Sequence, residues 1–175
     1  MTQFLNYKIL FCLGFILISF QLKGYSQYHY KGEKAFELAW GKSDIGYLFK
    51  GAYSKYFKDN WYFKGLLFYE SGRPFQTNYH NLGFQGLACY SPFNINYDAF
   101  FNVVGGVAIN YESLLNLDLA AKSSTNFGLV YGLEGEFFVN EQVAFIAGAY
   151  QNTLFNKKFG NERWDFTIGL KFLIH

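Results

Sequence analysis

The sequence contains little proline, little cysteine and little charge. Of its 175 residues, two are Pro, two are Cys and 16% are Asp, Glu, Lys or Arg. Scarce proline permits uninterrupted β-ladders. Low charge together with a 23% aromatic content excludes an intrinsically disordered chain, whose composition is the opposite. What remains is a folded chain rich in residues that favour strands, with 22 Phe and 15 Tyr.

No apolar run is long enough to cross a membrane as a helix. The run Ile9–Phe20 has 12 residues, whereas a spanning helix needs about 20. Lys8 precedes this run, and Gly24 and Ser26 follow it with the spacing of small residues at a signal-peptide cleavage site. We expect residues 1–26 to be a cleaved signal peptide, with an uncleaved anchor as the alternative, and residues 27–175 to form one domain.

Cleavage would remove Cys12, Lys8 and Lys23. Cys89 would then be the only cysteine, which excludes a disulfide within the chain and disfavours a cysteine-based metal site. The 15 basic residues would fall to 13 and equal the 13 acidic ones. A neutral chain lacks the basic face that binds nucleic acid, so no direct nucleic-acid binding is expected.

The rest of the chain shows strand periodicity, because large apolar side chains recur at every second position and polar or small ones lie between them. In the segment 143–151 the periodicity does not show which side chains face inward. The periodicity predicts eight strands, at about 34–41, 46–57, 61–70, 80–90, 99–111, 127–139, 143–151 and 164–174.

A soluble secreted β-sandwich also alternates and is the main structural alternative. Two features favour a membrane barrel: the apolar face is heavily aromatic, and the connections alternate between short and long. The short turns are expected at 58–60, 91–96 and 140–142, and the long loops at 71–79, 112–126 and 152–163, with 42–45 as a short exception. Sheets that cross a membrane must close on themselves, because unpaired backbone groups are not tolerated in lipid. The sequence therefore predicts an all-β protein, an eight-stranded antiparallel up-and-down transmembrane β-barrel in the cell outer membrane, in contact with its lipid and with both termini in the periplasm.

An eight-stranded barrel is filled by its own side chains. We expect the inward charges to form a paired network in the lumen, since an unpaired buried charge is costly; a proton or ion path is the alternative. The predicted network consists of Glu37, Lys64, Glu70, Glu134, Glu136, Asp165 and Lys171.

Candidates for catalysis are few. His29, His80 and His175 have no metal-ligand spacing. His80 lies near Ser71 and Glu70 across one expected hairpin, the arrangement to test for a lipid enzyme. Glu134 and Glu136 share one face, but lysines are their expected partners. We predict no enzyme, no metal site and no cofactor.

The glycine-rich stretch 105–113, which ends in Tyr111-Glu112-Ser113, resembles a strand and turn of the TraO family. The strand 127–137 and the close Gly169-Leu170-Lys171-Phe172 are also similar, whereas the ending at His175 departs from the usual aromatic close. TraO proteins belong to conjugative transposons of Bacteroidetes. The resemblance implies an accessory barrel of a conjugal DNA transfer apparatus, whose long loops contact other proteins of the apparatus. The alternatives are a general small barrel for envelope stability or adhesion, or a narrow porin.

Overall fold

The computed structural model describes residues 31–74, 77–95, 98–116, 119–155 and 162–174. The predicted signal peptide at 1–26, together with His29 and His175, lies outside these residues. The described chain forms eight strands: β1 (Lys34–Ser43), β2 (Gly46–Lys58), β3 (Trp61–Gly72), β4 (Asn78–Ile95), β5 (Ala99–Asn116), β6 (Leu119–Phe138), β7 (Val143–Leu154) and β8 (Glu162–Ile174). Within the described ranges, no helix has the length and apolarity needed to span a membrane.

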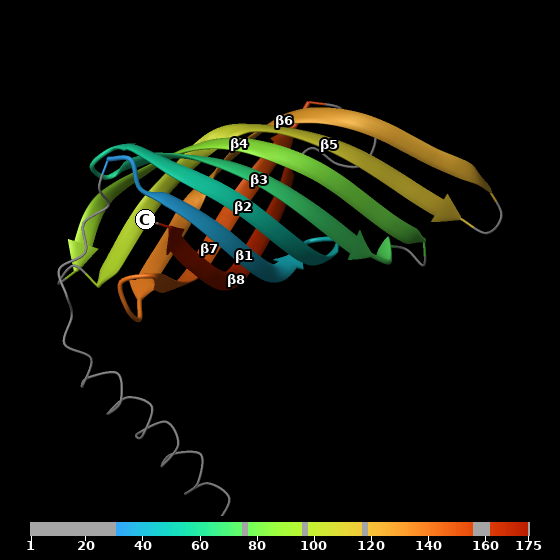
Figure 1. Ribbon diagram of the computed structural model, residues 1–175. Helices are drawn as coiled ribbons and strands as arrows, with labels where there is room; N and C mark the ends of the chain where they lie inside the picture. Colours follow the sequence, from blue (N-terminus) through green and yellow to red (C-terminus); the bar gives the residue numbers. More distant parts are fainter. Residues whose placement is uncertain (1–30, 75–76, 96–97, 117–118, 156–161, 175) are drawn as a thin grey trace, which may run out of the picture.

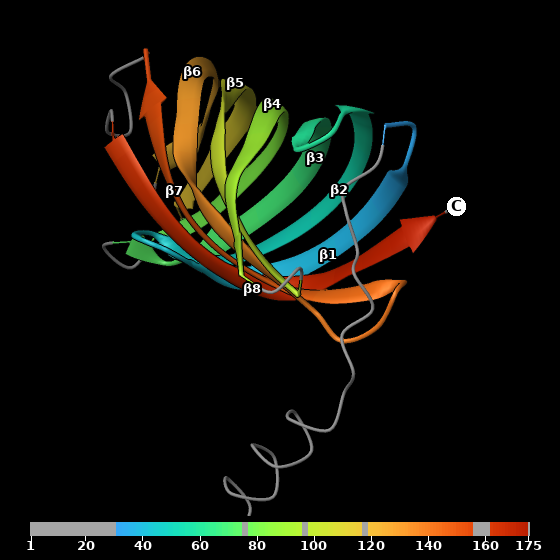
Figure 2. The same ribbon diagram turned by 90° about the vertical axis from the view of Figure 1, so that its left-hand side faces the viewer.

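The strands form one closed barrel in which each strand pairs antiparallel with its neighbour in the chain. β1 closes the ring by pairing with both β2 and β8, so that Lys34 lies opposite Lys55 on one side and Ile174 on the other. Figure 1 shows the strands inclined along the barrel, and Figure 2 shows them as a ring. The predicted eight-stranded up-and-down architecture is confirmed.

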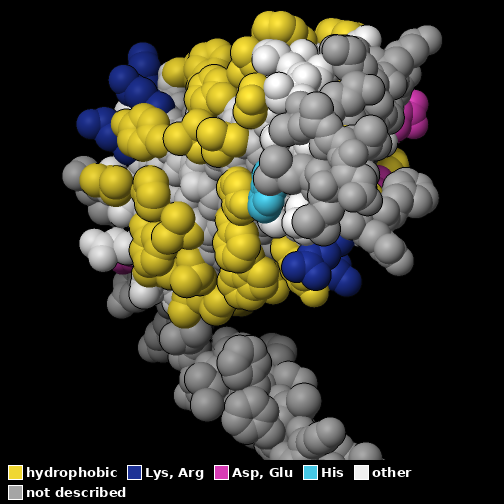
Figure 3. Space-filling model, turned by 90° about the vertical axis from the view of Figure 1, so that its right-hand side faces the viewer, with side chains coloured by type: hydrophobic (Ala, Val, Ile, Leu, Met, Phe, Trp, Pro, Cys, Tyr) yellow, Lys and Arg dark blue, Asp and Glu magenta, His cyan; other side chains and the backbone are white. Residues whose placement is uncertain are grey.

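Inward and outward side chains alternate along the strands. In β8, for example, Trp164, Phe166 and Ile168 are exposed while Asp165 and Thr167 are buried. The face predicted as apolar points outward throughout, and the space-filling view in Figure 3 shows hydrophobic side chains gathered on the outside of the barrel.

β7 is the strand whose facing was ambiguous from the sequence. The structure buries Ala144, Ile146 and Tyr150 and exposes Phe145 and Ala147. Alanine and glycine occupy positions on both faces of this strand, so the contrast in hydropathy between the faces is weak.

The two ends of the barrel differ. Short turns lie at the end that carries Lys34 and Ile174, whose Cα atoms are paired. One turn places Asn60 at a φ of 65°, and in another Asn140 Oδ1 accepts the backbone N–H groups of Gln142 and Val143, both at 2.9 Å. The opposite end, called here the loop end, carries the connections β1–β2, β3–β4, β5–β6 and β7–β8.

Two predicted connections are largely strand. Residues 91–95 continue β4 past a bulge between Tyr90 and Phe93. The expected loop 112–126 is a β-hairpin, in which β5 and β6 remain paired from Glu112–Ser124 up to Asn116–Leu119. In the sequence, two leucines follow one another at 114–115 and four polar residues follow one another at 123–126, so this segment lacks the hydrophobic alternation used to predict strands.

Adjacent glycines in β5 show how tightly the wall curves. Gly106 faces inward, and a Cβ there would lie 2.0 Å from the carbonyl oxygen of Gly86 in β4. Gly105 faces outward, and a Cβ there would have no heavy atom within 4 Å. Only the inward position therefore requires glycine, which fits the use of glycine at close backbone approaches in curved sheets.

We predict that Gly106→Val destabilises the barrel by about 3 kcal/mol or more, the upper end of overpacking effects, because its side chain meets backbone that cannot move without breaking the ladder. Gly105→Val is the matched control and should change stability by about 0.5 kcal/mol or less. Urea unfolding in detergent micelles, followed by heat-modifiable gel migration, measures both. Equal stability of the two variants would contradict this account of the wall.

Candidate functional site

The barrel interior contains a column of charged side chains. The described residues place six carboxylates and four cations there, each at most 5% exposed. They come from six of the eight strands, every one but β4 and β7, because inward positions of different strands converge on the same lumen. The acids are Glu37, Glu70, Glu112, Glu134, Glu136 and Asp165, and the bases are Lys50, Lys64, Arg163 and Lys171.

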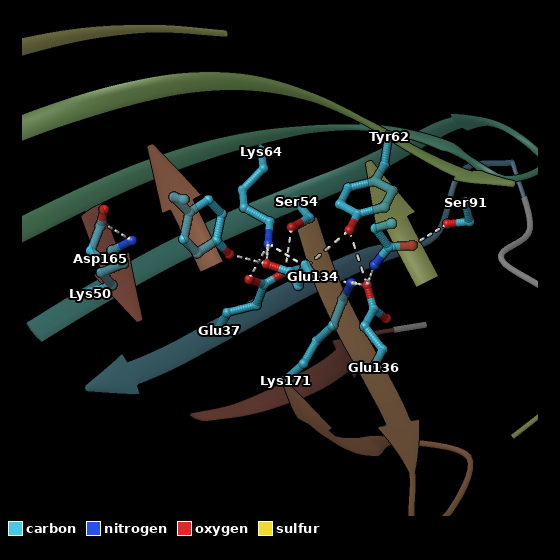
Figure 4. A network of polar contacts seen from close by, with 12 residues as sticks. Glu37, Lys50, Ser54, Tyr62, Lys64, Ser91, Glu134, Glu136, Asp165 and Lys171 are labelled. Atoms are coloured by element: carbon cyan, nitrogen blue, oxygen red, sulfur yellow. Dashed lines mark hydrogen bonds and ion pairs between the residues drawn. The ribbon is translucent and has the colours of Figure 1, made fainter. Parts of the chain in front are cut away.

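Two lysines join three glutamates in a central cluster (Figure 4). Lys64 Nζ lies 2.8 Å from Glu134 Oε2 and 2.6 Å from Glu37 Oε2. Lys171 Nζ lies 2.8 Å from Glu136 Oε1 and 3.5 Å from Glu37 Oε1. Glu37 therefore bridges the two lysines, and charges from β1, β3, β6 and β8 are tied across the lumen.

Neutral donors offset the excess of carboxylates in this cluster. The Tyr62 hydroxyl donates to Glu134 at 3.2 Å and to Glu136 at 3.0 Å, and the Tyr150 hydroxyl also donates to Glu134. Ser54 donates to Glu37 at 2.9 Å. Lys171 Nζ also lies 4.5 Å from the centroid of the Tyr62 ring, within the range of a cation–π contact.

A second cluster lies nearer the loop end. Arg163 Nη1 is 2.5 Å from Glu112 Oε1 and 4.0 Å from Glu70 Oε2. The Tyr79 hydroxyl donates to Glu112 at 3.1 Å, and Asn81 Nδ2 donates to Glu70 at 2.9 Å. This cluster ties β8 to β3, β4 and β5 across the upper lumen.

A third pair lies between the two clusters. Lys50 Nζ is 2.7 Å from Asp165 Oδ2 and 4.0 Å from the centroid of the Tyr150 ring. Asn152 Nδ2 donates to Asp165 at 2.7 Å, and Gln85 Nε2 donates to Asn152 at 3.0 Å. Tyr150, whose hydroxyl donates to Glu134, connects this pair to the central cluster.

The structure brings five of the seven sequence-predicted residues together in the central cluster: Glu37, Lys64, Glu134, Glu136 and Lys171. The other two lie apart from it. Glu70 lies with Arg163 in the second cluster, and Asp165 pairs with Lys50.

Sequence reasoning missed Lys50, Glu112 and Arg163 as interior charges. A signal was present for each in the two-residue period: Lys50 follows the outward Phe49, Glu112 follows the outward Tyr111, and Arg163 lies two residues before the inward Asp165. The last two fell in segments expected to be loops, where the period was not applied.

The interior leaves little free volume. A cavity of about 10 Å³ lies beside Lys50 and Tyr150, and another of about 20 Å³ lies beside Glu70 and Arg163. Each has room for about one water molecule. This part of the lumen is packed with side chains and is not an aqueous channel.

The residues considered for catalysis are not assembled. His80 accepts or donates a 2.7 Å hydrogen bond through Nδ1 with the Tyr69 hydroxyl on the outer side of the barrel. Ser71 is paired with His80 in the ladder, but Glu70 points inward to Asn81. Among the described residues, no group of three or more His, Cys, Asp or Glu side chains has the geometry to hold a metal ion.

Fold and interior together define an outer-membrane type of eight-stranded β-barrel. No protein-family model matches the chain, and no curated protein matches it. Several solved structures do match the chain. The N-terminal β-barrel domain of Pseudomonas aeruginosa OprF aligns with a TM-score of 0.68 and 15% identity, over 85% of this chain and 100% of that one. Neisserial surface protein A aligns with a TM-score of 0.65 and 15% identity, over 80% and 95% of the two chains.

Ail, the attachment invasion locus protein of Yersinia pestis, aligns with a TM-score of 0.57 and 12% identity, over 82% of this chain and 99% of that one. At these identities the likeness shows the fold. Membership of the TraO family is not shown by any of these comparisons.

We predict that Lys64→Met destabilises the barrel by about 3–5 kcal/mol, the cost of leaving buried charges without their partner, because Glu37 and Glu134 lose their closest cation. Lys55→Met, on an exposed position of the same hairpin, is the matched control. Adding Glu134→Gln to Lys64→Met should recover part of the loss. Urea unfolding in micelles measures the stability of the wild type, the two single variants and the double variant. Wild-type stability of Lys64→Met would show that the network does not hold the interior together.

Proposed function

We propose that this chain is a non-enzymatic barrel of the bacterial outer membrane that presents a β-hairpin to a protein partner. The observation that carries the proposal is the β5–β6 hairpin, which extends beyond the other strands at the loop end in Figure 1. Export through the signal peptide predicted at 1–26 would bring the chain to this membrane and leave both termini in the periplasm.

The outer wall supports placement in a membrane. Leu67 is 61% exposed and Phe49 is 60% exposed, and side chains of this kind surround the barrel. Aromatic residues near the short turns stack on one another, as Trp61 does on Tyr90 with ring centroids 4.5 Å apart. Apolar walls bounded by aromatic girdles are typical of barrels that contact lipid.

The packed lumen favours an anchoring role over a narrow porin. Lys64 and Lys171, each held by two glutamates, occupy the centre of the barrel. Opening a path for ions would separate these buried pairs, and each broken pair is strongly unfavourable. Function is therefore assigned to the outside of the barrel and to its loop end.

The hairpin offers backbone groups to a partner. β5 pairs with β4 as far as Leu115, whereas the described ladder between β6 and β7 ends at Gly128–Leu154. A hairpin that extends past the neighbouring ladders can receive an extended segment of another protein by strand addition.

The resemblance of residues 105–113 to the TraO family directs this proposal to conjugal DNA transfer. In that setting the hairpin would contact another protein of the transfer apparatus, and the barrel would hold the contact at the membrane. Contact with DNA itself is not part of the proposal. A general barrel for envelope stability or adhesion fits the same fold, and the experiment below separates the two.

We predict that replacing residues 114–122 by an Asn-Gly turn, which closes a two-residue hairpin on the Ser113–Ser123 pair, leaves the barrel folded but lowers conjugation frequency to that of a gene deletion. Glu141→Ala, in a turn at the opposite end, is the control and should transfer at the wild-type frequency. Mating assays measure transfer, and heat-modifiable migration confirms folding.

Two results would count against this function. Wild-type transfer by the shortened hairpin would remove the hairpin from the mechanism. Unchanged transfer in the complete deletion, together with increased sensitivity to detergent, would replace the conjugation role with a general envelope role.

A further inference from the structure

An apolar groove of about 680 Å³ crosses the outer wall of the barrel. Its floor consists of three small residues on β6 and β7, namely Gly135, Ala147 and Ala149. In the cross-strand direction large side chains lie at the two ends of this floor: Phe101 and Leu133 at one end, and Phe166 and Ile168 at the other.

The strand register explains why the small residues form a continuous depression. Ala147 lies opposite Gly135 in β6, so two small residues are adjacent across the ladder. On its other side Ala147 lies opposite Ile168 in β8, and Ala149 lies opposite Phe166. The groove thus follows two cross-strand rows of the sheet, which run obliquely through the membrane because the strands of such barrels are tilted.

One end of the groove is basic. The rows continue from β8 to Trp40 and Lys42 of β1, and from Lys42 to Tyr47 of β2. Lys42 Nζ lies 5.7 Å from the centroid of the Tyr47 ring, beside the first connection at the loop end. Lys42 is exposed, and the ion pairs of the described residues do not include it.

The groove is therefore complementary to a lipid. It offers an apolar surface for an acyl chain and one cation at the level where the wall meets the headgroups. Its volume lies within the range of about 300–1,000 Å³ that small-molecule sites occupy. Glu134 also borders the groove, but its carboxylate faces the lumen, where Lys64 binds it. Asp44, the acid nearest to Lys42 along the outer face of β1 and its turn, accepts the backbone N–H of Trp164 at 2.8 Å and forms no ion pair with Lys42 among the described residues.

We propose that this groove is a binding site for one acyl chain of a phosphate-bearing lipid in the leaflet at the loop end, with Lys42 binding the phosphate. The chain lies on Gly135, Ala147 and Ala149 and continues over Phe166 and Ile168 towards Lys42. This site rests on the membrane placement proposed above, but not on the hairpin or on conjugation.

The test uses Trp40, which lines the groove, as a reporter. The full mature protein carrying Trp61→Phe and Trp164→Phe keeps Trp40 as its only tryptophan. It is reconstituted in phosphatidylcholine vesicles that contain a small fraction of acyl-brominated phosphatidylglycerol or acyl-brominated phosphatidylcholine. Bromine quenches tryptophan fluorescence on contact, so quenching reports which lipid occupies the groove.

We expect phosphatidylglycerol to be enriched beside Trp40 by about fivefold over phosphatidylcholine, the factor that one lysine–phosphate contact provides. Lys42→Gln should abolish this preference. Ala147→Phe should abolish the enrichment by filling the groove, whereas Ala88→Phe, at an exposed alanine of β4 away from the groove, should leave it unchanged. Ala149→Phe replaces Ala147→Phe if that variant fails to show heat-modifiable migration.

The outcomes distinguish failure of the lipid site from failure of the membrane placement. Quenching that is equal for both lipids, or enrichment that survives Ala147→Phe and Lys42→Gln, overturns the lipid site while leaving the membrane placement intact. Absence of quenching by either brominated lipid overturns the membrane placement itself.

Discussion

Closure of the hydrogen-bond ladder between β1 and β8 is the constraint on which the rest of this structure depends. Lys34 at the start of β1 pairs with Ile174 at the end of β8, so the first and last described strands protect each other's edges. A sheet without this pairing would expose a row of backbone N–H and C=O groups, which lipid does not tolerate. Closure also decides what lies inside, because it brings strands that are distant in the chain to opposite sides of one narrow lumen. The outward aromatic wall and the buried charges are two consequences of the same ring.

Because the barrel is narrow, its interior side chains must both pack closely and pair their charges. Inward glycines such as Gly106 let neighbouring backbones approach, while long side chains such as Lys64 and Lys171 reach across to acids on opposite strands. The described interior has more carboxylates than cations, and hydroxyl and amide groups donate further hydrogen bonds to these carboxylates. Buried ion pairs are weak evidence for net stability. They do specify one arrangement of the strands, because a shift in register would leave a charge in the lumen without its partner.

Because packed side chains fill the interior, we assign function to the outer surfaces of the barrel. The lipid-facing wall is uneven, since Ala147 and Gly135 form a depression where most outward positions carry large side chains. The loop end is uneven as well, since β6 remains paired with β5 beyond its described ladder with β7. The similarity to OprF and neisserial surface protein A extends over most of this chain but concerns the fold. The proposals for this chain therefore rest on the depression in its wall and on its β5–β6 hairpin.

The two-residue period of the sequence determined the strand number, the outward aromatic face and the inward position of seven lumen charges. It could do so because successive side chains of a strand point to opposite faces of the sheet. It was uninformative in β7, where alanine occupies both faces. It was misleading at 112–126, where polar and apolar residues do not alternate and the paired strands were taken for a loop. Which charges meet was decided by tertiary structure alone. Lys64 binds Glu134 and Arg163 binds Glu112 because ring closure places β3 opposite β6 and brings β8 within reach of β5. Pairing across a lumen depends on strand tilt, register and curvature, and these properties belong to the closed sheet rather than to any one segment of the chain.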